Sequence, residues 1–370
     1  MPEYRFDEIA FNSKEKKKPT EEDKYTYIGL EHLDTGSLTV SRWGSEIAPT
    51  GDKLVMHKGD VLFGKRRAYQ KKVAIAPFDG IFSAHGMVLR PKEEVITKDF
   101  FPLFVSSDYF LDEAIKISVG SLSPTINWSD LKELSFTIPS LEEQKKLAPV
   151  IWAAIDTKNA YKKLLLGIDE LVKSQFIEMI ANTECMPLSE ICSSYGRGKT
   201  PKYVDSSRVH VLNQACIYWD GLRTENIKFY DETKFSNDNA LQYGDVLLNS
   251  TGTGTLGRAH VFDIEDDYTY TADSHVSILR PLSDKMLPVV LQYYFYDDYY
   301  QSELYRTCVF GSTSQAELSK EALARMPVPI IGMEKQEAFV AFVEQSDKSK
   351  FELTQAISRI DDMIKALMQG

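Results

Sequence analysis

The stretch with the clearest ligand-binding spacing lies in the second half of the chain. Gly252, Gly254 and Gly257 fit the Gly-x-Gly-x-x-Gly pattern of a dinucleotide site, but residues 258–262 predict a strand where that site requires a helix. The pattern is better explained as a hairpin loop whose small residues let hydrogen-bond donors approach a phosphate. The side-chain donors in and beside this loop are Thr251, Thr253, Thr255 and Arg258.

Basic side chains gather at two other places. Residues 64–68 correspond in the first half to the glycine-rich loop, and residues 196–202 form a second segment rich in Gly and Lys. Neither has the spacing of a phosphate-binding P-loop. For each segment, contact with nucleic acid and a plain solvent-exposed loop are about equally compatible with the sequence. The basic residues that we assign to DNA contact are Lys65, Arg66, Arg67, Lys71, Lys72, Arg197, Lys199 and Lys202.

The sequence offers no set of residues that would carry out a reaction. His85 and His275 occupy equivalent positions, but no other His or Cys is spaced to complete a metal site with either. Structural roles at strand ends are favoured for both. The motifs of ATP-binding proteins, amino-methyltransferases and many nucleases are missing. We therefore predict a protein that is not an enzyme and has no catalytic, cofactor-binding or metal-binding residues.

Length and composition indicate a folded, multidomain protein. The chain has 370 residues, 43% of them hydrophobic, so two or three domains are expected. Its net charge of −11 does not by itself indicate a nucleic-acid binder. The first residues lack the apolar centre of a signal peptide, no segment is apolar enough to span a bilayer, and the four cysteines form no close pair. We expect a cytoplasmic protein with reduced thiols.

The two halves of the chain repeat one another. Gly59-Asp-Val-Leu62 returns as Gly244-Asp-Val-Leu247, and later matches follow at spacings of 190 to 192 residues. These later matches pair His85 with His275, Asp108 with Asp298, Gly120-Ser121 with Gly311-Ser312, and Pro139 with Pro329. The chain is therefore predicted to be one structural unit written twice.

Each copy predicts short strands followed by an aromatic helical stretch. The aromatic residues are favoured as core, rather than as platforms for stacking bases, because they recur in both copies at helical spacing. The predicted strands are Lys53–Phe63, Lys72–Ile75 and Gly86–Leu89, then Val246–Leu248, Ala259–Phe262 and His275–Leu279, and the predicted helices are Phe100–Ile117 and Leu287–Tyr305.

A long helix follows each copy. Ser140 stands three residues before Glu143, which is the spacing of a capping box, and apolar residues then recur at steps of four and three up to Met179. The same steps recur from Phe339 to Leu367, although Gly332–Gln336 lacks the Ser cap. We predict that the two helices pack on each other, antiparallel or nearly so. The alternative is two ordinary amphipathic helices, each buried on its own domain.

These patterns together define the expected fold. It is an α+β protein with a pseudo-twofold internal repeat, in which two similar mixed α/β domains are joined by two long helices that form an antiparallel coiled coil. The predicted boundaries are 1–139 for the first domain, 140–181 for the first helix, 182–332 for the second domain and 333–370 for the second helix.

The duplicated arrangement resembles the specificity subunit of Type I restriction-modification systems. The matching segments are Tyr27–Gly36, Gly59–Gly64, Ile138–Gln144, Val211–Ala215 and Gly244–Leu248. Each is short, but their order and duplication are specific, and they span nearly the whole chain.

The resemblance implies two target-recognition domains that each read half of a split, asymmetric sequence in double-stranded DNA, with the helices as a spacer. It also implies that two methyltransferase subunits dock on the helices, that restriction/translocase subunits join through them, and that no membrane is involved. S-adenosylmethionine, ATP and magnesium would then be bound by the partner subunits. A stand-alone DNA-modification enzyme and a coiled-coil scaffold protein remain the alternatives.

Overall fold

The chain divides into two compact units. The computed structural model describes residues 2–311 and 316–369. The first unit consists of residues 1–163 and 353–370, and the second consists of residues 164–352. Each unit therefore contains one of the predicted domains and part of both long helices. No helix of the described residues is long and apolar enough to cross a membrane.

The first unit contains two four-stranded sheets, with strand orders β2-β9-β6-β7 and β3-β5-β8-β4. Its strands are β1 (Glu3–Arg5), β2 (Ala10–Asn12), β3 (Lys16–Lys17), β4 (Tyr27–Ile28), β5 (Lys53–Met56), β6 (Val61–Phe63), β7 (Val73–Ile75), β8 (Gly80–Phe82), β9 (Met87–Pro91) and β10 (Ser135–Thr137). Its helices are α1 (Phe6–Ile9), α2 (Phe101–Ser106), α3 (Asp108–Lys116), α4 (Trp128–Leu131), the first part of α5 (Leu141–Ile180) and the last part of α10 (Met333–Gln369).

The second unit repeats this plan, with sheets β12-β21-β18-β19 and β13-β17-β14-β20. Its strands are β11 (Cys185–Pro187), β12 (Cys192–Arg197), β13 (Tyr203–Val204), β14 (Val209–Leu212), β15 (Ile217–Tyr218), β16 (Gly221–Leu222), β17 (Lys228–Tyr230), β18 (Val246–Asn249), β19 (Ala259–Val261), β20 (Thr269–Ala272), β21 (Val276–Pro281), β22 (Val309–Phe310), β23 (Glu317–Leu318) and β24 (Pro327–Pro329). Besides the rest of α5 and α10, its helices are α6 (Leu188–Ile191), α7 (Pro288–Tyr296), α8 (Asp298–Cys308) and α9 (Lys320–Ala324).

The first sheet is the same in both units, and the second sheet is not. The order β2-β9-β6-β7 corresponds strand for strand to β12-β21-β18-β19. In the second sheet both units keep one parallel pair, β4 with β8 and β14 with β20. The next strand joins opposite members of that pair, because β5 pairs with β8 whereas β17 pairs with β14. The repeat is therefore conserved in one sheet and rearranged in the other.

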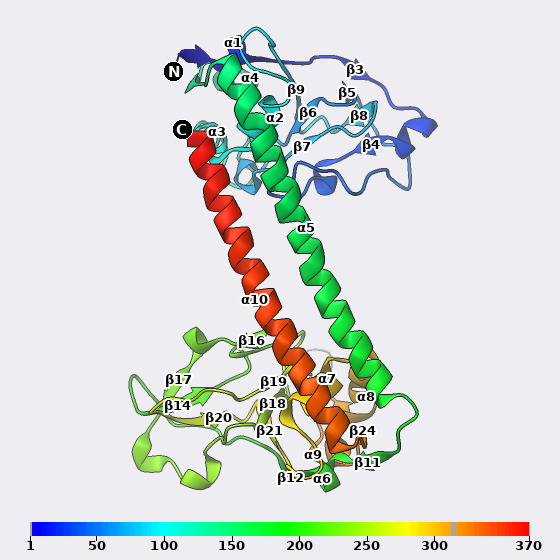
Figure 1. Cartoon of the computed structure of the whole chain (residues 1–370), viewed down its shortest axis with the longest axis vertical. Coiled ribbons are helices and arrows are strands. Elements are labelled where there is room, and N and C mark those ends of the chain that lie inside the picture. The colour runs from blue at the N-terminus through cyan, green and yellow to red at the C-terminus, as the bar shows by residue number, and fades with distance from the viewer. Residues whose placement is uncertain (1, 312–315, 370) are drawn as a thin grey trace. The chain divides into compact units, whose positions relative to one another are not determined.

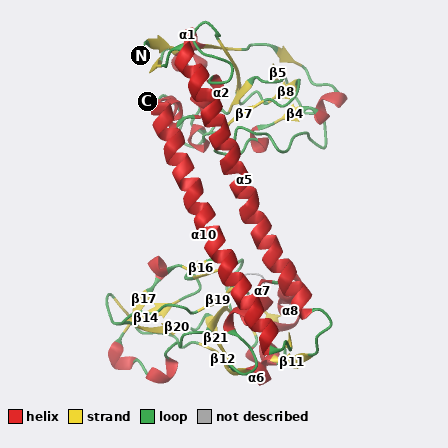
Figure 2. Ribbon diagram, viewed as in Figure 1, coloured by secondary structure: helices red, strands yellow, loops and turns green. Residues whose placement is uncertain are grey.

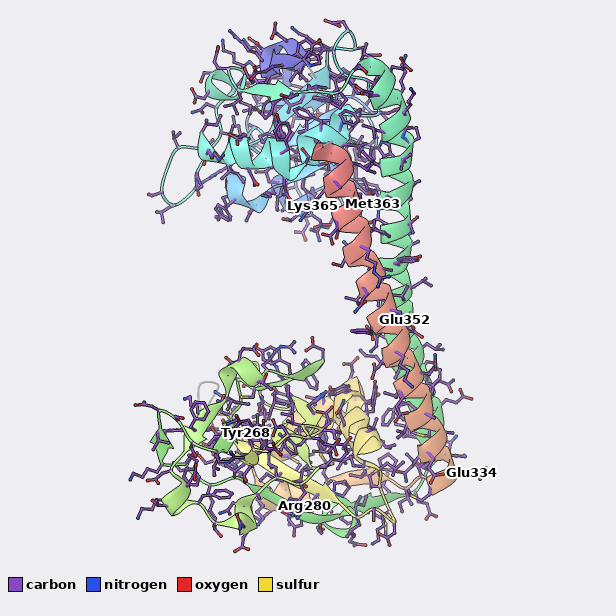
Figure 3. All side chains as sticks on the ribbon, turned by 60° about the vertical axis from the view of Figure 1, so that its left-hand side comes forward. Tyr268, Arg280, Glu334, Glu352, Met363 and Lys365 are labelled. Atoms are coloured by element: carbon purple, nitrogen blue, oxygen red, sulfur yellow. The ribbon has the colours of Figure 1, made fainter. Side chains whose placement is uncertain are left out.

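The repeated Gly-Asp-Val-Leu segment is a turn followed by a buried strand. Gly59 and Gly244 have positive φ angles of 92° and 89°, which residues with a Cβ rarely adopt. Asp60 then forms a two-pronged ion pair with Arg90, and Asp245 does the same with Arg280, with nitrogen–oxygen distances of 2.7–2.8 Å. Figure 3 labels Arg280 in the second unit. This turn breaks the predicted run Lys53–Phe63 into β5 and β6.

The aromatic helical stretches are each two helices. Ser107 caps α3 by accepting a hydrogen bond from the Phe110 N–H, and Asp297 caps α8 through the N–H groups of Tyr299 and Tyr300. A cap requires extended backbone, so it ends the preceding helix. The aromatic residues are mostly core, as predicted: those of α2 and α7 that are buried include Phe101, Phe104, Tyr294 and Phe295.

The long helices α5 and α10 run side by side in opposite directions within each unit (Figures 1 and 2). In the first unit Lys158 of α5 pairs with Asp361 of α10, and in the second unit Asp169 of α5 pairs with Lys350 of α10 at 3.2 Å. Lys350 and Asp361 each lie 192 positions after the equivalent residue of α5, so the two ion pairs are copies of each other. The predicted antiparallel pairing of the helices is confirmed within each unit. The predicted internal repeat is confirmed by the elements that the two units share.

A buried glutamine anchors the start of each long helix. Gln144 and Gln336 are both 0% exposed. The amide oxygen of each accepts one backbone N–H, and the amide nitrogen donates to two backbone carbonyls of its own unit. The predicted Ser140–Glu143 capping box is present on α5, where Glu143 accepts from the Ser140 N–H at 2.8 Å. Helix α10 begins at Met333 without such a box.

The cysteines differ in their expected reactivity. Cys192, Cys216 and Cys308 are buried, whereas Cys185 is exposed. Burial raises the pKa of Cys192 to about 12 and that of Cys216 to about 11, so their reactive thiolate forms are scarce at neutral pH. We expect a thiol reagent such as DTNB to modify one cysteine per native chain rapidly at pH 7.5 and all four after unfolding. Peptide mapping that located the fast site elsewhere than Cys185 would contradict this expectation.

Candidate nucleic-acid interface

Three loops of the first unit converge on one cavity. They are the turn after β4, the loop after β6 and the turn between β8 and β9. The cavity has a volume of about 380 Å³. The residues that line it are Tyr27, Leu30, Glu31, Arg66, Arg67, Gln70, Lys72, Ser83 and His85. A second cavity of about 410 Å³ shares Tyr27, Ser83 and His85 with the first, so the hollow continues past the histidine.

Positive charge dominates the loop after β6. The side chains of Arg66 and Arg67 are exposed and make no hydrogen bond or ion pair with a described residue. Lys72, from the same cavity, donates to the Leu30 carbonyl at 2.7 Å. Arg67 has a positive φ of 54°, so the backbone of the loop turns at this residue. Free guanidinium groups beside an open cavity suit contact with phosphates or with acceptors on base edges.

The same three loops meet in the second unit with different side chains. Thr251 occupies the place of Arg66, because each residue forms an isolated β-bridge in the loop after the equivalent strand. Thr251 bridges to Glu317, and Arg66 bridges to Thr125. The hydroxyl of Thr251 lies 2.9 Å from Nδ1 of His275 and 3.4 Å from Oε1 of Gln214. This site therefore has polar Thr and Gln side chains at the point where the first unit has arginines.

A glycine allows the loop of the second unit to close over Gln214. Gly252 has a φ of +94°, and a Cβ added there would lie 2.7 Å from Oε1 of Gln214 and 2.6 Å from Oγ1 of Thr255. The predicted role of the glycine-rich segment as a loop between strands is confirmed, since it joins β18 to β19. All three glycines adopt positive φ angles, and Gly252 also allows this close approach.

Several predicted DNA-contact residues are held by internal partners. Lys71 lies 2.8 Å from Asp108 and 2.7 Å from Asp112, and these hydrogen bonds raise the pKa of its amine. Arg197 pairs with Glu317 and donates to the Leu318 carbonyl. Lys71 is thus held by α3, whereas Arg197 lies beside the converging loops, because its partner Glu317 forms the isolated β-bridge with Thr251. Contact of either residue with DNA stays a prediction.

The remaining predicted residues lie in or near the loops of the second unit. Lys202 pairs with Asp231 at 3.1 Å, and Lys199 is exposed. Thr255 donates within its own loop, and Arg258 donates to the Gly254 carbonyl while its guanidinium lies 4.8 Å from the Tyr218 ring centroid. Thr253 is exposed. Their contact with DNA stays a prediction, as does that of Lys65, Arg66, Arg67 and Lys72.

The histidines lie at the predicted strand ends, in the turns between β8 and β9 and between β20 and β21. Both are exposed. Asp273 accepts from the His275 N–H at 2.9 Å, and burial raises the pKa of its carboxyl. Within residues 2–311 and 316–369, no group of three or more His, Cys, Asp and Glu side chains could hold a metal ion.

Sequence reasoning missed two residues of the second site. Gln214 belongs to a segment that matched the family pattern, but nothing in its spacing indicated that its side chain faces Thr251. Asn249 is 0% exposed at the end of β18; its Nδ2 donates to the Gln214 carbonyl at 3.1 Å, and its Oδ1 has no partner among the described residues. Leu30 and Gln214 each lie two positions after an equivalent strand, β4 or β14. This shared position is the signal that could have indicated both residues.

Comparison with known proteins identifies the family. The model of the Type I restriction modification DNA specificity domain matches residues 6–165 and again residues 181–360. The Type I restriction enzyme EcoDI specificity subunit of Escherichia coli is 28% identical over 145 residues, which are 39% of this chain and 32% of that protein. The match thus spans about a third of the length of that curated relative.

Solved structures share the fold. A structure described as the structural basis of complex assembly and conformational transition of the type I R-M system covers 100% of this chain and 96% of its own, with 17% identity and a TM-score of 0.64. The S subunit of a Type I restriction-modification system from M. genitalium covers 99% and 95%, with 15% identity and a TM-score of 0.57. Because the family model matches nearly the whole chain in two copies, this chain belongs to the Type I restriction-modification DNA specificity domain family.

Proposed function

We propose that this chain is the sequence-specific DNA-recognition subunit of a Type I restriction-modification complex and that it reads a bipartite, asymmetric target. The observation that carries the proposal is that two copies of one framework present different side chains from the same three loops. The first copy presents Arg66 and Arg67, and the second presents Thr251 and Gln214, beside a histidine that both copies share. Different side chains on equal frameworks suit different base sequences.

We further propose that the chain is not itself an enzyme and acts with partner subunits. Two methyltransferase subunits would dock on α5 and α10, and restriction/translocase subunits would join through them. The partners would bind S-adenosylmethionine, ATP and magnesium. Family membership supports this arrangement, as does the likeness to a structure that describes complex assembly of the type I R-M system.

The test is a comparison of DNA methylation in host cells with and without the gene. We expect the deletion to abolish methylation at one motif made of two short specific parts separated by an unread spacer, and expression of the gene from a plasmid to restore it. An unchanged methylation pattern in cells that make the methyltransferase subunit would contradict the proposed function.

Reversing the charge of the loop after β6 tests the interface. We expect the triple variant Lys65→Glu/Arg66→Glu/Arg67→Glu to weaken DNA binding by the assembled complex at least tenfold at moderate salt, because three cations near phosphates become anions. The slope of log affinity against log salt should also become shallower. Binding would be measured by fluorescence anisotropy on a duplex that carries the methylated motif.

The control for this loop is Lys116→Glu, which changes an exposed lysine of α3 that pairs with Glu113. It should leave affinity and salt dependence unchanged. Equal affinity of the triple variant and the wild type between 50 and roughly 200 mM salt would remove this loop from the interface.

A further inference from the structure

We infer that Gln214 is a base-reading residue of the second unit and that it recognises an A·T pair through the major-groove edge of adenine, whereas Arg66 reads guanine in the corresponding site of the first unit. This inference rests on the proposed function. It assigns base chemistry to one side chain in each copy, Gln214 from the loop after β14 and Arg66 from the loop after β6, in the sites that the same three loops form.

The backbone at Gln214 is fixed on both sides. Nδ2 of the buried Asn249 donates to the Gln214 carbonyl at 3.1 Å. Asn213 is 7% exposed; its Oδ1 accepts from the Ala215 N–H at 2.8 Å and its Nδ2 donates to the Asn226 carbonyl at 2.9 Å. A reader gains discrimination when its position is set before the ligand arrives, since less motion is lost on binding.

A relay of hydrogen bonds orients the amide of Gln214. Nδ1 of His275 lies 2.9 Å from the Thr251 hydroxyl, which donates onward to Oε1 of Gln214 at 3.4 Å. The hydroxyl has a single proton, so it donates to Gln214 when His275 is in the tautomer that carries its hydrogen on Nδ1 and donates to the hydroxyl. Nε2 of Gln214 makes no hydrogen bond with any described residue, and the side chain is half-buried. The amide therefore presents an unpaired donor beside an acceptor that retains one lone pair.

This pair of groups matches adenine. A glutamine amide can donate to N7 of adenine and accept from its N6 amino group, whereas the major-groove edge of guanine offers two acceptors and suits an arginine. The site thus presents an amide whose free donor and acceptor match the edge of adenine.

The first unit reverses the chemistry at the equivalent positions. The parallel pairs β4–β8 and β14–β20 align Ile28 with Leu212, so Leu30 stands where Gln214 does. Leu30 has no amide, and Arg66, at the place of Thr251, supplies a free guanidinium instead. One framework therefore carries an amide reader in one copy and a guanidinium reader in the other.

The experiment is the variant Gln214→Glu in the full chain, produced with its methyltransferase partner in cells whose methylated motif is then sequenced. A carboxylate accepts but cannot donate, and it suits the amino group of cytosine. We expect methylation at the wild-type motif to fall roughly tenfold to a hundredfold at one A·T position of one half, with a shift toward C·G there. The other half of the motif should not change.

Two further variants complete the test. Arg66→Gln should change one G·C position toward A·T in the opposite half of the motif. Gln214→Leu, which copies Leu30, should relax the A·T position so that all base pairs are accepted; it decides the question if the glutamate variant does not fold. The control Asn237→Asp adds the same charge at an exposed residue of the same unit and should leave the motif unchanged.

The outcomes separate the inference from the proposed function. If Gln214→Glu or, where it does not fold, Gln214→Leu leaves every position of the motif as in the wild type, Gln214 is not the reader and the inference is overturned while the subunit remains a DNA-recognition protein. If the wild-type complex methylates no bipartite motif, the proposed function itself fails. Changes in both halves from one variant would also overturn the inference, since each unit is assigned its own half.

Discussion

Replacing Asp245 by alanine is expected to lower the free energy of unfolding of the second unit by about 3 kcal/mol. Its carboxylate is 0% exposed, holds Arg280 by two hydrogen bonds of 2.7 Å and accepts from the Gln242 N–H at 2.8 Å. Removing it leaves a partly buried guanidinium without its partner and a backbone N–H without an acceptor. Urea unfolding followed by circular dichroism measures the loss, and limited proteolysis shows which unit opens first.

The chain contains its own matched control for Asp245. Asp60 has the same contacts in the first unit, with Arg90 and the His57 N–H, so Asp60→Ala should expose the first unit to protease and leave the second protected. The double variant Asp245→Ala/Arg280→Met should recover part of the loss, because it removes the unpaired charge. Equal stability of Asp245→Ala and the wild type would show that the ion pair is dispensable.

The repeat and the long helices were predictable because they depend on local patterns. The apolar steps of α5 and α10 are visible in the sequence, and so is the recurrence of Gly-Asp-Val-Leu. The breaks inside the predicted elements were not recovered. The strand run ends at Gly59 because the turn needs a positive φ, and the aromatic helices divide at Ser107 and Asp297 because those side chains cap the next helix. Each signal is a single residue inside a longer favourable pattern.

The candidate site was predictable only where the repeat aligned its loops. The loops around Arg66 and Thr251 were matched from spacing alone, and the structure places them at equivalent bridges. Gln214 faces Thr251 from 37 positions earlier, so only the folded sheet brings the two together. The internal partners of Arg197 also lie far along the chain, at Glu317 and Leu318, and no local pattern indicates them.

The two sheets divide framework from variation. The sheet built on β6 and β18 keeps its strand order in both copies and carries the Asp–Arg ion pair. The second sheet accepts its next strand on opposite sides of the parallel pair, and two of the three loops of each site leave from that pair. The third loop, after β6 or β18, leaves from the conserved sheet. A conserved sheet that positions the loops, beside a sheet free to rearrange, lets the copies differ in recognition without losing the common core.

Replacing Gln336 by leucine is expected to destabilise the second unit by about 3–4 kcal/mol, from several lost hydrogen bonds of a buried amide. Its Oε1 accepts from the Leu287 N–H at 2.8 Å, and its Nε2 donates to the carbonyls of Lys285 and Ile331 at 2.9 and 2.7 Å. Leucine leaves these three buried or partly buried backbone groups without the partner they have in the wild type. The loss would be measured by urea unfolding and by hydrogen exchange of the first turns of α10.

The equivalent change Gln144→Leu should lower the free energy of unfolding of the first unit by about 1 kcal/mol less than Gln336→Leu lowers that of the second. The reason is that Ser140 and Glu143 still cap the start of α5. The comparison therefore separates two ways to fix a helix end. On α5 the cap and the buried amide share the task, whereas α10 begins at Met333 without a cap and depends on Gln336. If the two leucine variants lost equal stability, or if the first turns of α10 stayed protected in Gln336→Leu, the amide would not be the anchor of the second helix.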